Sequence, residues 1–272
     1  MKPADVRSNL RRGVYVIPTS FTVLNVFFGF RCIVNSMLAM TDIADGRFSA
    51  SAAHFERACM ALVIAAIMDT FDGLVARALG ATSEFGKEYD SLADVVTFGA
   101  APAVLVYAWG LHPLDKLGGG LAFVFLVAVS LRLARFNVQT GKTDYRYFVG
   151  LPSPAGALTI AAMINYAPSP VTDRRFAFVI AIVTVAVAFA MVSPIRYRSQ
   201  KGLNLQKERS LMYFVVLALI VAIASKWPKE FCFVFAIGYL TSGPILRLWA
   251  IAFPHKLPPP GDTLTPVEAE AP

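Results

Sequence analysis

Residues 61–107 read ALVIAAIMDTFDGLVARALGATSEFGKEYDSLADVVTFGAAPAVLVY. Two strongly apolar runs in this stretch flank a set of acids, which are Asp69, Asp72, Asp90 and Asp94. Ionisable side chains at membrane depth are costly, and a functional site is their default explanation. Four acids of one sign would repel one another unless divalent cations share them. The stretch therefore predicts a metal site, and its metals are expected to handle phosphate.

The composition of the whole chain indicates an integral membrane protein. Of its 272 residues, 56% are hydrophobic, and the mean hydropathy is +0.58. A soluble domain of this length would have too little polar surface to cover such content. Apolar runs near the 20 or so residues that a membrane span needs occur at roughly 15–40, 53–76, 91–111, 119–138, 154–168, 174–193, 210–226 and 230–251. They predict an all-α, polytopic membrane bundle of about eight transmembrane helices.

Lysine and arginine are unevenly divided between the two sets of loops that such a bundle would have. They are concentrated before the first apolar run and after the second, fourth, sixth and eighth runs. Cytoplasmic loops carry such an excess, so both termini and the face with the aspartates are predicted to be cytoplasmic. We divide the chain into a basic cytoplasmic segment (1–14), a membrane domain (15–256) and a disordered tail (257–272).

Helical periodicity places the acids on two faces. If the second apolar run continues as a helix through the acidic stretch, Asp69, Asp72 and Ala76 share one of its faces. Asp90 and Asp94, four residues apart, share a face near the start of the next run. A turn between the two helices would bring both faces together. Carboxylate ligands without His or Cys suit Mg²⁺ or Mn²⁺, and two such ions can clamp a diphosphate.

Small and polar residues accompany the acids. Gly73 and Ala76 remove side-chain bulk where a flat base or a sugar would approach the helix. Arg77 can hold a phosphate with two hydrogen bonds, and Ser83 can donate another. The alternatives are a buried ion network and a divalent-cation transporter that uses the same carboxylates. A transporter would need a polar path to the far side, and the apolar run at 58–68 argues against one.

This pattern resembles the signature of the CDP-alcohol phosphatidyltransferase family. The fixed positions of the signature are Asp69, Asp72, Gly73, Ala76, Arg77, Gly86, Asp90 and Asp94. The resemblance implies a membrane enzyme that transfers a phosphatidyl group from a CDP-linked lipid to an alcohol and releases CMP. It also implies a homodimer in the bacterial inner (plasma) membrane, with the active site facing the cytoplasm and no nucleic-acid partner.

The resemblance further implies roles for single residues. Asp69, Asp72 and Asp90 would ligate one divalent metal, Asp90 and Asp94 would contribute to a second, and Asp94 would be the general base on the acceptor hydroxyl. The residues expected to contact the CDP-lipid are Gly73, Ala76, Arg77, Ser83, Gly86, Thr19 and Thr22. In the first span, the family often has Pro-Asn followed by a Thr. Here Pro18-Thr19 replaces Pro-Asn, and Thr22 is kept. Thr22 and Asn25 either face the donor pocket or pack as satisfied polar groups between helices.

Three further stretches bear on the acceptor alcohol. They are RLARFN at 132–137, GLPSP at 150–154 and MVSPIRY at 191–197. Together they resemble the phosphatidylserine synthase branch of the family, which implies CDP-diacylglycerol and L-serine as substrates. Arg132 and Arg135 could hold the serine carboxylate, Ser153 is expected to cap a helix there, and Arg196 and Lys201 could bind the same carboxylate or the diphosphate. Glycerol 3-phosphate, inositol phosphate and choline are the alternative acceptors.

Overall fold

The computed structural model describes residues 3–80, 83–139, 147–194, 196–198 and 226–252. The long helices are α1 (Pro3–Ala44), α2 (Phe48–Ala78), α5 (Asp115–Gln139), α7 (Arg174–Val192) and α9 (Pro228–Ala252). The shorter ones are α3 (Glu84–Asp94), α4 (Ala101–Val106) and α6 (Ser153–Tyr166), with π-helical turns η1 (Val95–Ala100) and η2 (Tyr107–Leu111) and a 3-10 turn η3 (His112–Leu114). Strands β1 (Tyr147–Val149) and β2 (Arg196–Arg198) complete the order.

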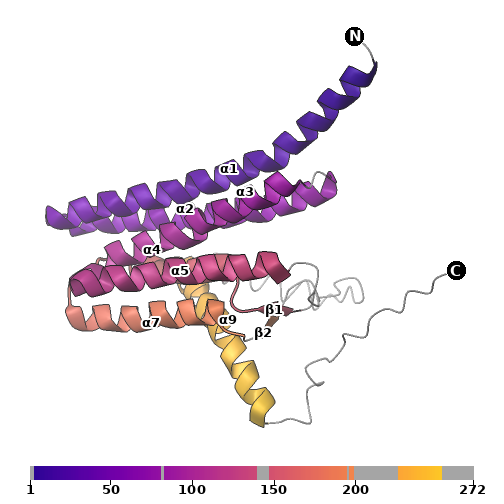
Figure 1. Cartoon of the computed structure of the whole chain (residues 1–272). Helices are drawn as coiled ribbons and strands as arrows, with labels where there is room; N and C mark the ends of the chain where they lie inside the picture. Colours follow the sequence, from indigo (N-terminus) through magenta and orange to yellow (C-terminus); the bar gives the residue numbers. More distant parts are fainter. Residues whose placement is uncertain (1–2, 81–82, 140–146, 195, 199–225, 253–272) are drawn as a thin grey trace.

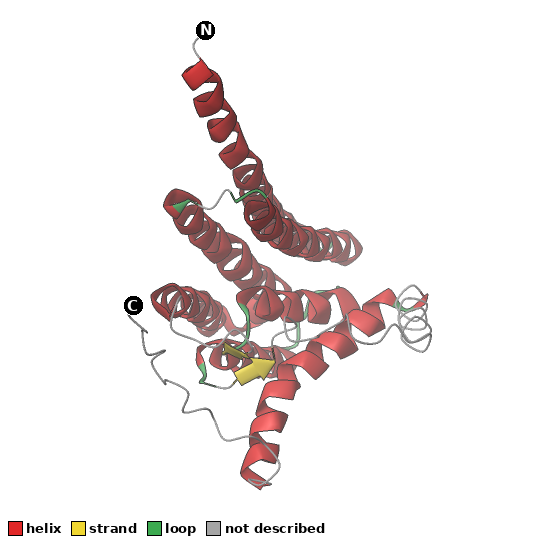
Figure 2. Cartoon of the chain, turned by 90° about the vertical axis from the view of Figure 1, so that its right-hand side faces the viewer, coloured by secondary structure: helices red, strands yellow, loops and turns green. Residues whose placement is uncertain are grey.

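The helices form a layered bundle. In Figure 1, α1 and α2 lie side by side at one edge, α3 and α4 lie below them, and α5 and α7 follow, all with similar axis directions. Helix α9 crosses this bundle at a steep angle. The start of α3, the end of α5 and both strands lie at one end of the bundle, and Figure 2 views the molecule from that end. Motifs that are far apart in the sequence are therefore gathered at one end.

Four helical segments within the described residues are long and apolar enough to cross a membrane. They are Thr19–Ala44, Phe48–Ala78, Glu84–Val138 and Arg174–Val192. The third contains a reversal of the chain at Asp115, whose φ is 51°. Helix α5 therefore packs back against η1 and α4 (Figure 1), and two of the predicted apolar runs lie in this one segment.

The predicted count of eight spans is thus not confirmed. Helix α6, in the fifth apolar run, has only 14 residues, which is fewer than a span needs. Residues 210–225 of the run at 210–226, and the whole tail at 257–272, lie outside the described residues. Helix α9 matches the last run in position but is not among the four segments. The small sheet was also not expected from the sequence.

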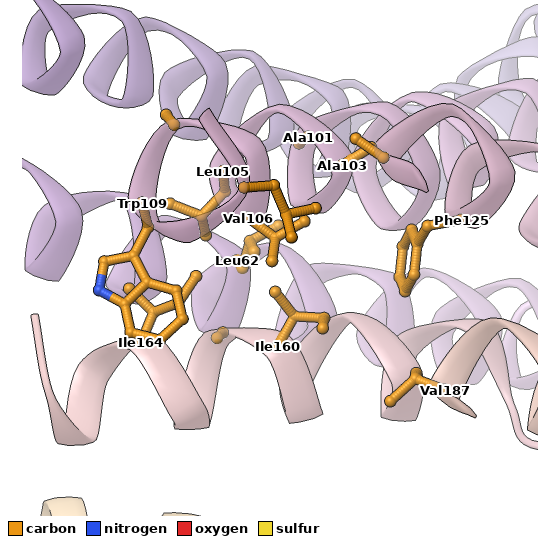
Figure 3. Close-up of a cluster of buried hydrophobic side chains, with 14 of the residues drawn as sticks. Leu62, Ala101, Ala103, Leu105, Val106, Trp109, Phe125, Ile160, Ile164 and Val187 are labelled. Atoms are coloured by element: carbon orange, nitrogen blue, oxygen red, sulfur yellow. The ribbon is translucent and has the colours of Figure 1, made fainter. Parts of the chain in front are cut away.

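An apolar core forms where α2, α4, α5, α6 and α7 meet. Figure 3 shows part of this cluster, including Leu62, Leu105, Val106, Phe125, Ile160, Ile164 and Val187. Trp109 lies at its edge, and its indole N–H donates to the carbonyl oxygens of Ala167 and Ser169, at 2.9 and 3.0 Å. These contacts tie the end of α6 to η2. The core thereby fixes α6, whose start belongs to the candidate site.

The sheet and a glycine set where α6 begins. Strands β1 and β2 pair antiparallel, with Val149 opposite Arg196. The next residue, Gly150, has a φ of 81°, and the Leu151 N–H donates to the carbonyl of Ala190 at 3.0 Å. A Cβ on Gly150 would lie 2.2 Å from the carbonyl oxygen of Met191. The loop before α6 can therefore lie against the end of α7 only because residue 150 has no side chain.

Gly150→Ala is expected to destabilise the protein. The φ alone costs about 1–3 kcal/mol for a residue with a Cβ, and the contact with the Met191 carbonyl adds to this cost. Thermal unfolding of the purified protein in detergent measures the effect. The matched control is Gly238→Ala on α9, where a Cβ meets nothing within 4 Å and φ is not positive. An equal melting temperature for Gly150→Ala and the wild type would contradict the prediction.

Candidate active site

The two acidic helices end and begin at well-defined caps. Helix α2 ends at Ala78, and Gly80 follows with a φ of 60° and donates its N–H to the carbonyl of Arg77 at 3.3 Å. Ser83 is the N-cap of α3, and its hydroxyl oxygen accepts a hydrogen bond from the Gly86 N–H at 2.9 Å. Such caps satisfy backbone groups that a helix leaves unpaired. They fix where the acids of each helix lie.

The structure brings the predicted acids together. Carboxylate oxygens of Asp69, Asp90 and Asp94 all lie within 4.8 Å of one another. Asp72 lies beside them, facing Asp90, and is only 8% exposed. Asp69 in turn faces Asp94. The helical periodicity of the sequence predicted both faces, and the structure places the two faces opposite each other.

The residues of this cluster fit a divalent metal. The Oδ1 atoms of Asp90 and Asp94 are buried and have no hydrogen-bond partner among the described residues. In the same part of the chain, no lysine or arginine forms an ion pair with any of the four carboxylates. Buried carboxylate oxygens that lie close together and lack partners are costly. A hard cation with oxygen ligands satisfies them and removes their repulsion.

Helix α1 supports the cluster from the other side. The hydroxyl of Thr22 donates to Oδ2 of Asp72 at 2.6 Å, and Thr22 is buried. Thr19, one turn earlier, is half-buried. The family resemblance assigns Thr22 to the CDP-lipid, and the structure adds that its hydroxyl orients one of the acids. Nothing in the spacing of the two residues, 50 positions apart, could have indicated this bond.

The residues expected to contact the CDP-lipid lie around the acids on α2 and α3. A Cβ on Gly73 would meet nothing within 4 Å, so the helix surface is open at this position. Ala76 is half-buried. Arg77 is exposed, and its Nε donates to the carbonyl of Gly73 at 2.8 Å. Ser83 and Gly86 form the cap of α3 described above.

A half-buried arginine reaches the acids from α5. Arg132 donates from its NH1 group to the hydroxyl oxygen of Ser153 at 2.6 Å, and it interacts electrostatically with Asp94. Its Nε is buried and has no partner among the described residues. The predicted helix cap at Ser153 is wrong, because Pro152 is the N-cap of α6 and Ser153 is its first residue. The Ser153 hydroxyl binds Arg132 instead of a backbone N–H.

The remaining basic candidates are less well placed or not described. Arg135 is exposed, and its NH1 group lies 3.4 Å from the carbonyl oxygen of Val192. Arg196 lies in β2, where only the backbone is described, and Lys201 lies outside the described residues. Tyr239 of α9 interacts electrostatically with Arg132. Sequence reasoning missed this tyrosine, because it lies in an apolar run without a motif.

Comparison with known proteins agrees with this geometry. The family model described as CDP-alcohol phosphatidyltransferase matches residues 15–196. The chain belongs to this family. CDP-alcohol phosphatidyltransferases are enzymes that use divalent metals, and the acidic cluster is present here. Family membership therefore favours the enzyme over the transporter that the carboxylates alone left open.

Several curated relatives of this CDP-alcohol phosphatidyltransferase carry a more specific name. A CDP-diacylglycerol--serine O-phosphatidyltransferase of Helicobacter pylori is 30% identical over 87% of this chain and 92% of its own length. A protein of the same name from Mycobacterium leprae is 32% identical over 92% of this chain and 81% of its own length. An archaetidylserine synthase of Methanothermobacter thermautotrophicus is 34% identical over 69% of this chain and 72% of its own length.

Proposed function

We propose that this enzyme transfers the phosphatidyl group of CDP-diacylglycerol to the hydroxyl of L-serine, giving phosphatidylserine and CMP. The observation that carries the proposal is the cluster of Asp69, Asp90 and Asp94 beside a half-buried arginine, Arg132. The names of the relatives from three organisms support serine as the acceptor. Arg132 supports it too, because serine brings a carboxylate that needs a cation in a partly buried site.

The acids are proposed to hold two divalent ions, Mg²⁺ or Mn²⁺. Asp69, Asp72 and Asp90 would ligate one ion, and Asp90 and Asp94 would contribute to the second. When bound, the ions supply charge stabilisation for the diphosphate and lower the proton affinity of the attacking hydroxyl. The Oδ1 atoms of Asp90 and Asp94, which have no hydrogen-bond partner among the described residues, support this assignment. The bond from Thr22 holds Asp72 in a fixed orientation.

The protein groups then have distinct tasks in the transfer. Asp94 accepts the proton of the serine hydroxyl as its oxygen attacks the phosphorus that carries the diacylglycerol. A new P–O bond to serine forms, the bond from that phosphorus to the oxygen shared with CMP breaks, and CMP leaves with the electron pair. Arg132, held by Ser153 and close to Asp94, would bind the serine carboxylate. This arrangement places acceptor and base side by side.

The donor lies on the other side of the acids in this proposal. Its cytidine and diphosphate would contact Gly73, Ala76, Arg77, Ser83, Gly86 and Thr19. The open surface at Gly73 supports an approach of the nucleotide to α2. Arg196 and Lys201 would bind the serine carboxylate or the diphosphate, and Arg135 would add positive charge near Arg132. We place the site at the cytoplasmic face of the inner membrane, on the basis of the distribution of basic residues, and propose a homodimer by analogy with the family.

The direct test is CMP release by the purified protein from CDP-diacylglycerol and Mn²⁺ or Mg²⁺. We expect release with serine, and loss of all release when EDTA removes the metal, because the carboxylates then repel both one another and the diphosphate. Restoring an excess of Mn²⁺ should restore release. Release that persists in EDTA after extensive dialysis would contradict the metal centre.

The same assay tests the acceptor. Glycerol 3-phosphate, inositol, inositol phosphate and choline would replace serine in separate reactions. Metal-dependent release with one of these alcohols and not with serine would keep the transfer chemistry and refute the acceptor. No release with any alcohol would refute the proposed function as a whole.

A further inference from the structure

Asn25 is a buried amide without a hydrogen-bond partner in the part of the chain that the structure describes. It lies on α1, one turn after Thr22, and its exposed fraction is 0%. Neither Oδ1 nor Nδ2 has a hydrogen-bond partner among the described residues. The sequence left open whether Asn25 faces the donor pocket or is a satisfied group between helices. The structure argues against the second reading.

The surroundings of Asn25 belong to the acidic site. One turn before it, Thr22 holds Asp72 at 2.6 Å. Its own carbonyl oxygen accepts a hydrogen bond from the hydroxyl of Thr97 at 3.3 Å. Thr97 lies one turn after Asp94, in the π-helical turn η1. Asn25 therefore lies between two contacts: the bond from Thr22 to Asp72 of α2, and the bond from its own carbonyl to Thr97, in the turn that follows Asp94.

Helix α1 and the turn η1 approach each other closely one turn after Asn25. A Cβ on Gly29 would lie 2.6 Å from the hydroxyl oxygen of Thr97 and 2.9 Å from its Cα. The two helices can approach in this way only because residue 29 is a glycine. Single π-helical turns inside longer helices occur frequently at functional sites. Asn25 lies four residues before Gly29, on the same face of α1, so this packing places it on the face that meets η1.

A second buried asparagine on α1, Asn35, has hydrogen-bond partners for both polar atoms of its amide. Asn35 is 5% exposed. Its Nδ2 donates to the carbonyl of Arg31 at 2.8 Å, and its Oδ1 lies 3.2 Å from Nδ1 of His54. A buried amide without such partners is destabilising, and native proteins leave few of them. The partner of Asn25 is therefore expected to be a group that binds to the site.

We propose that Asn25 is part of the metal centre. Its amide oxygen contacts the bound divalent ion, either directly or through a water molecule that the ion holds. Amide carbonyl oxygens are among the ligands that such hard cations accept, and Mg²⁺ keeps several waters. The inference rests on the proposed function, because it requires that the acids bind a metal. It adds to the four acids a neutral ligand from a third helix.

The test compares metal affinity with the stability of the metal-free protein. For Asn25→Leu we expect Mn²⁺ binding, measured by the electron paramagnetic resonance signal of free Mn²⁺, to weaken about 10–100-fold. We expect the melting temperature in EDTA to stay equal or rise, because the unpaired amide is removed. Asn25→Asp keeps an oxygen ligand at this position. Its Mn²⁺ affinity should therefore stay close to that of the wild type.

Asn35→Leu is the matched control. It removes an amide whose two polar atoms are bonded, so we expect a lower melting temperature in EDTA and unchanged Mn²⁺ binding. Wild-type Mn²⁺ affinity in Asn25→Leu, or a loss of stability in EDTA as large as that of Asn35→Leu, would refute the role of Asn25. If the wild type does not bind Mn²⁺, or if Asp94→Asn binds it equally well, the metal centre itself fails, and the inference fails with it.

Discussion

Replacing Asp94 with Asn is expected to reduce metal-dependent CMP release by about 10²–10⁴-fold, the range typical for the loss of a general base. The substitution keeps the shape of the side chain but removes its negative charge and its ability to accept a proton. Because Asp94 faces Asp69 and lies within 4.8 Å of Asp90, the variant also loses a proposed metal ligand. Single-turnover CMP release at saturating serine and Mn²⁺ measures the effect.

The stability of the variant separates a functional loss from a folding defect. Removing one of several close carboxylates lowers their repulsion, so the metal-free Asp94→Asn protein should unfold at the same or a higher temperature than the wild type. Asp45→Asn is a suitable control, because Asp45 is exposed and pairs with Arg47 in the turn between α1 and α2. Full CMP release by Asp94→Asn would refute the general-base assignment. A lower melting temperature would show that Asp94 stabilises the fold.

The acidic site was predictable because its information is local. Asp69 and Asp72 share a helical face by spacing alone, as do Asp90 and Asp94, and a short turn between two long apolar runs allows only a tight helical connection. The end of the second helix is signalled locally too, because Gly80 is a residue type that commonly follows the last turn of a helix.

What the sequence did not reveal depends on contacts between distant segments. The bond from Thr22 to Asp72, the pairing of β1 with β2 and the contact of Gly150 with the end of α7 join residues about 40–50 positions apart. Helical periodicity carries no information on such pairs. The Ser153 hydroxyl was assigned to a helix cap, but it binds Arg132 of α5, 21 positions earlier in the chain. The count of eight spans is not confirmed for a different reason, since an apolar run such as 154–168 does not specify how long its helix becomes.

Arg132→Gln is expected to raise the KM for serine by about 10–100-fold, which corresponds to the roughly 1.5–3 kcal/mol of a hydrogen bond to a charged group. Arg132 is held by Ser153, and its buried Nε lacks a partner among the described residues, so it has a donor available for the acceptor. The KM for CDP-diacylglycerol should change little, because Arg132 lies on the acceptor side of the acids in the proposed mechanism. Initial rates of CMP release at varied concentrations of each substrate give both values.

The helix supplies its own control, since Arg135 lies three residues further along α5. It is exposed and makes one long contact to a backbone carbonyl, so Arg135→Gln should change the KM for serine less than threefold or so. Equal effects of the two substitutions would mean that both arginines act through the general positive charge of this face. A rise in the KM for CDP-diacylglycerol with Arg132→Gln would instead move Arg132 to the diphosphate, and serine would then need a different cation.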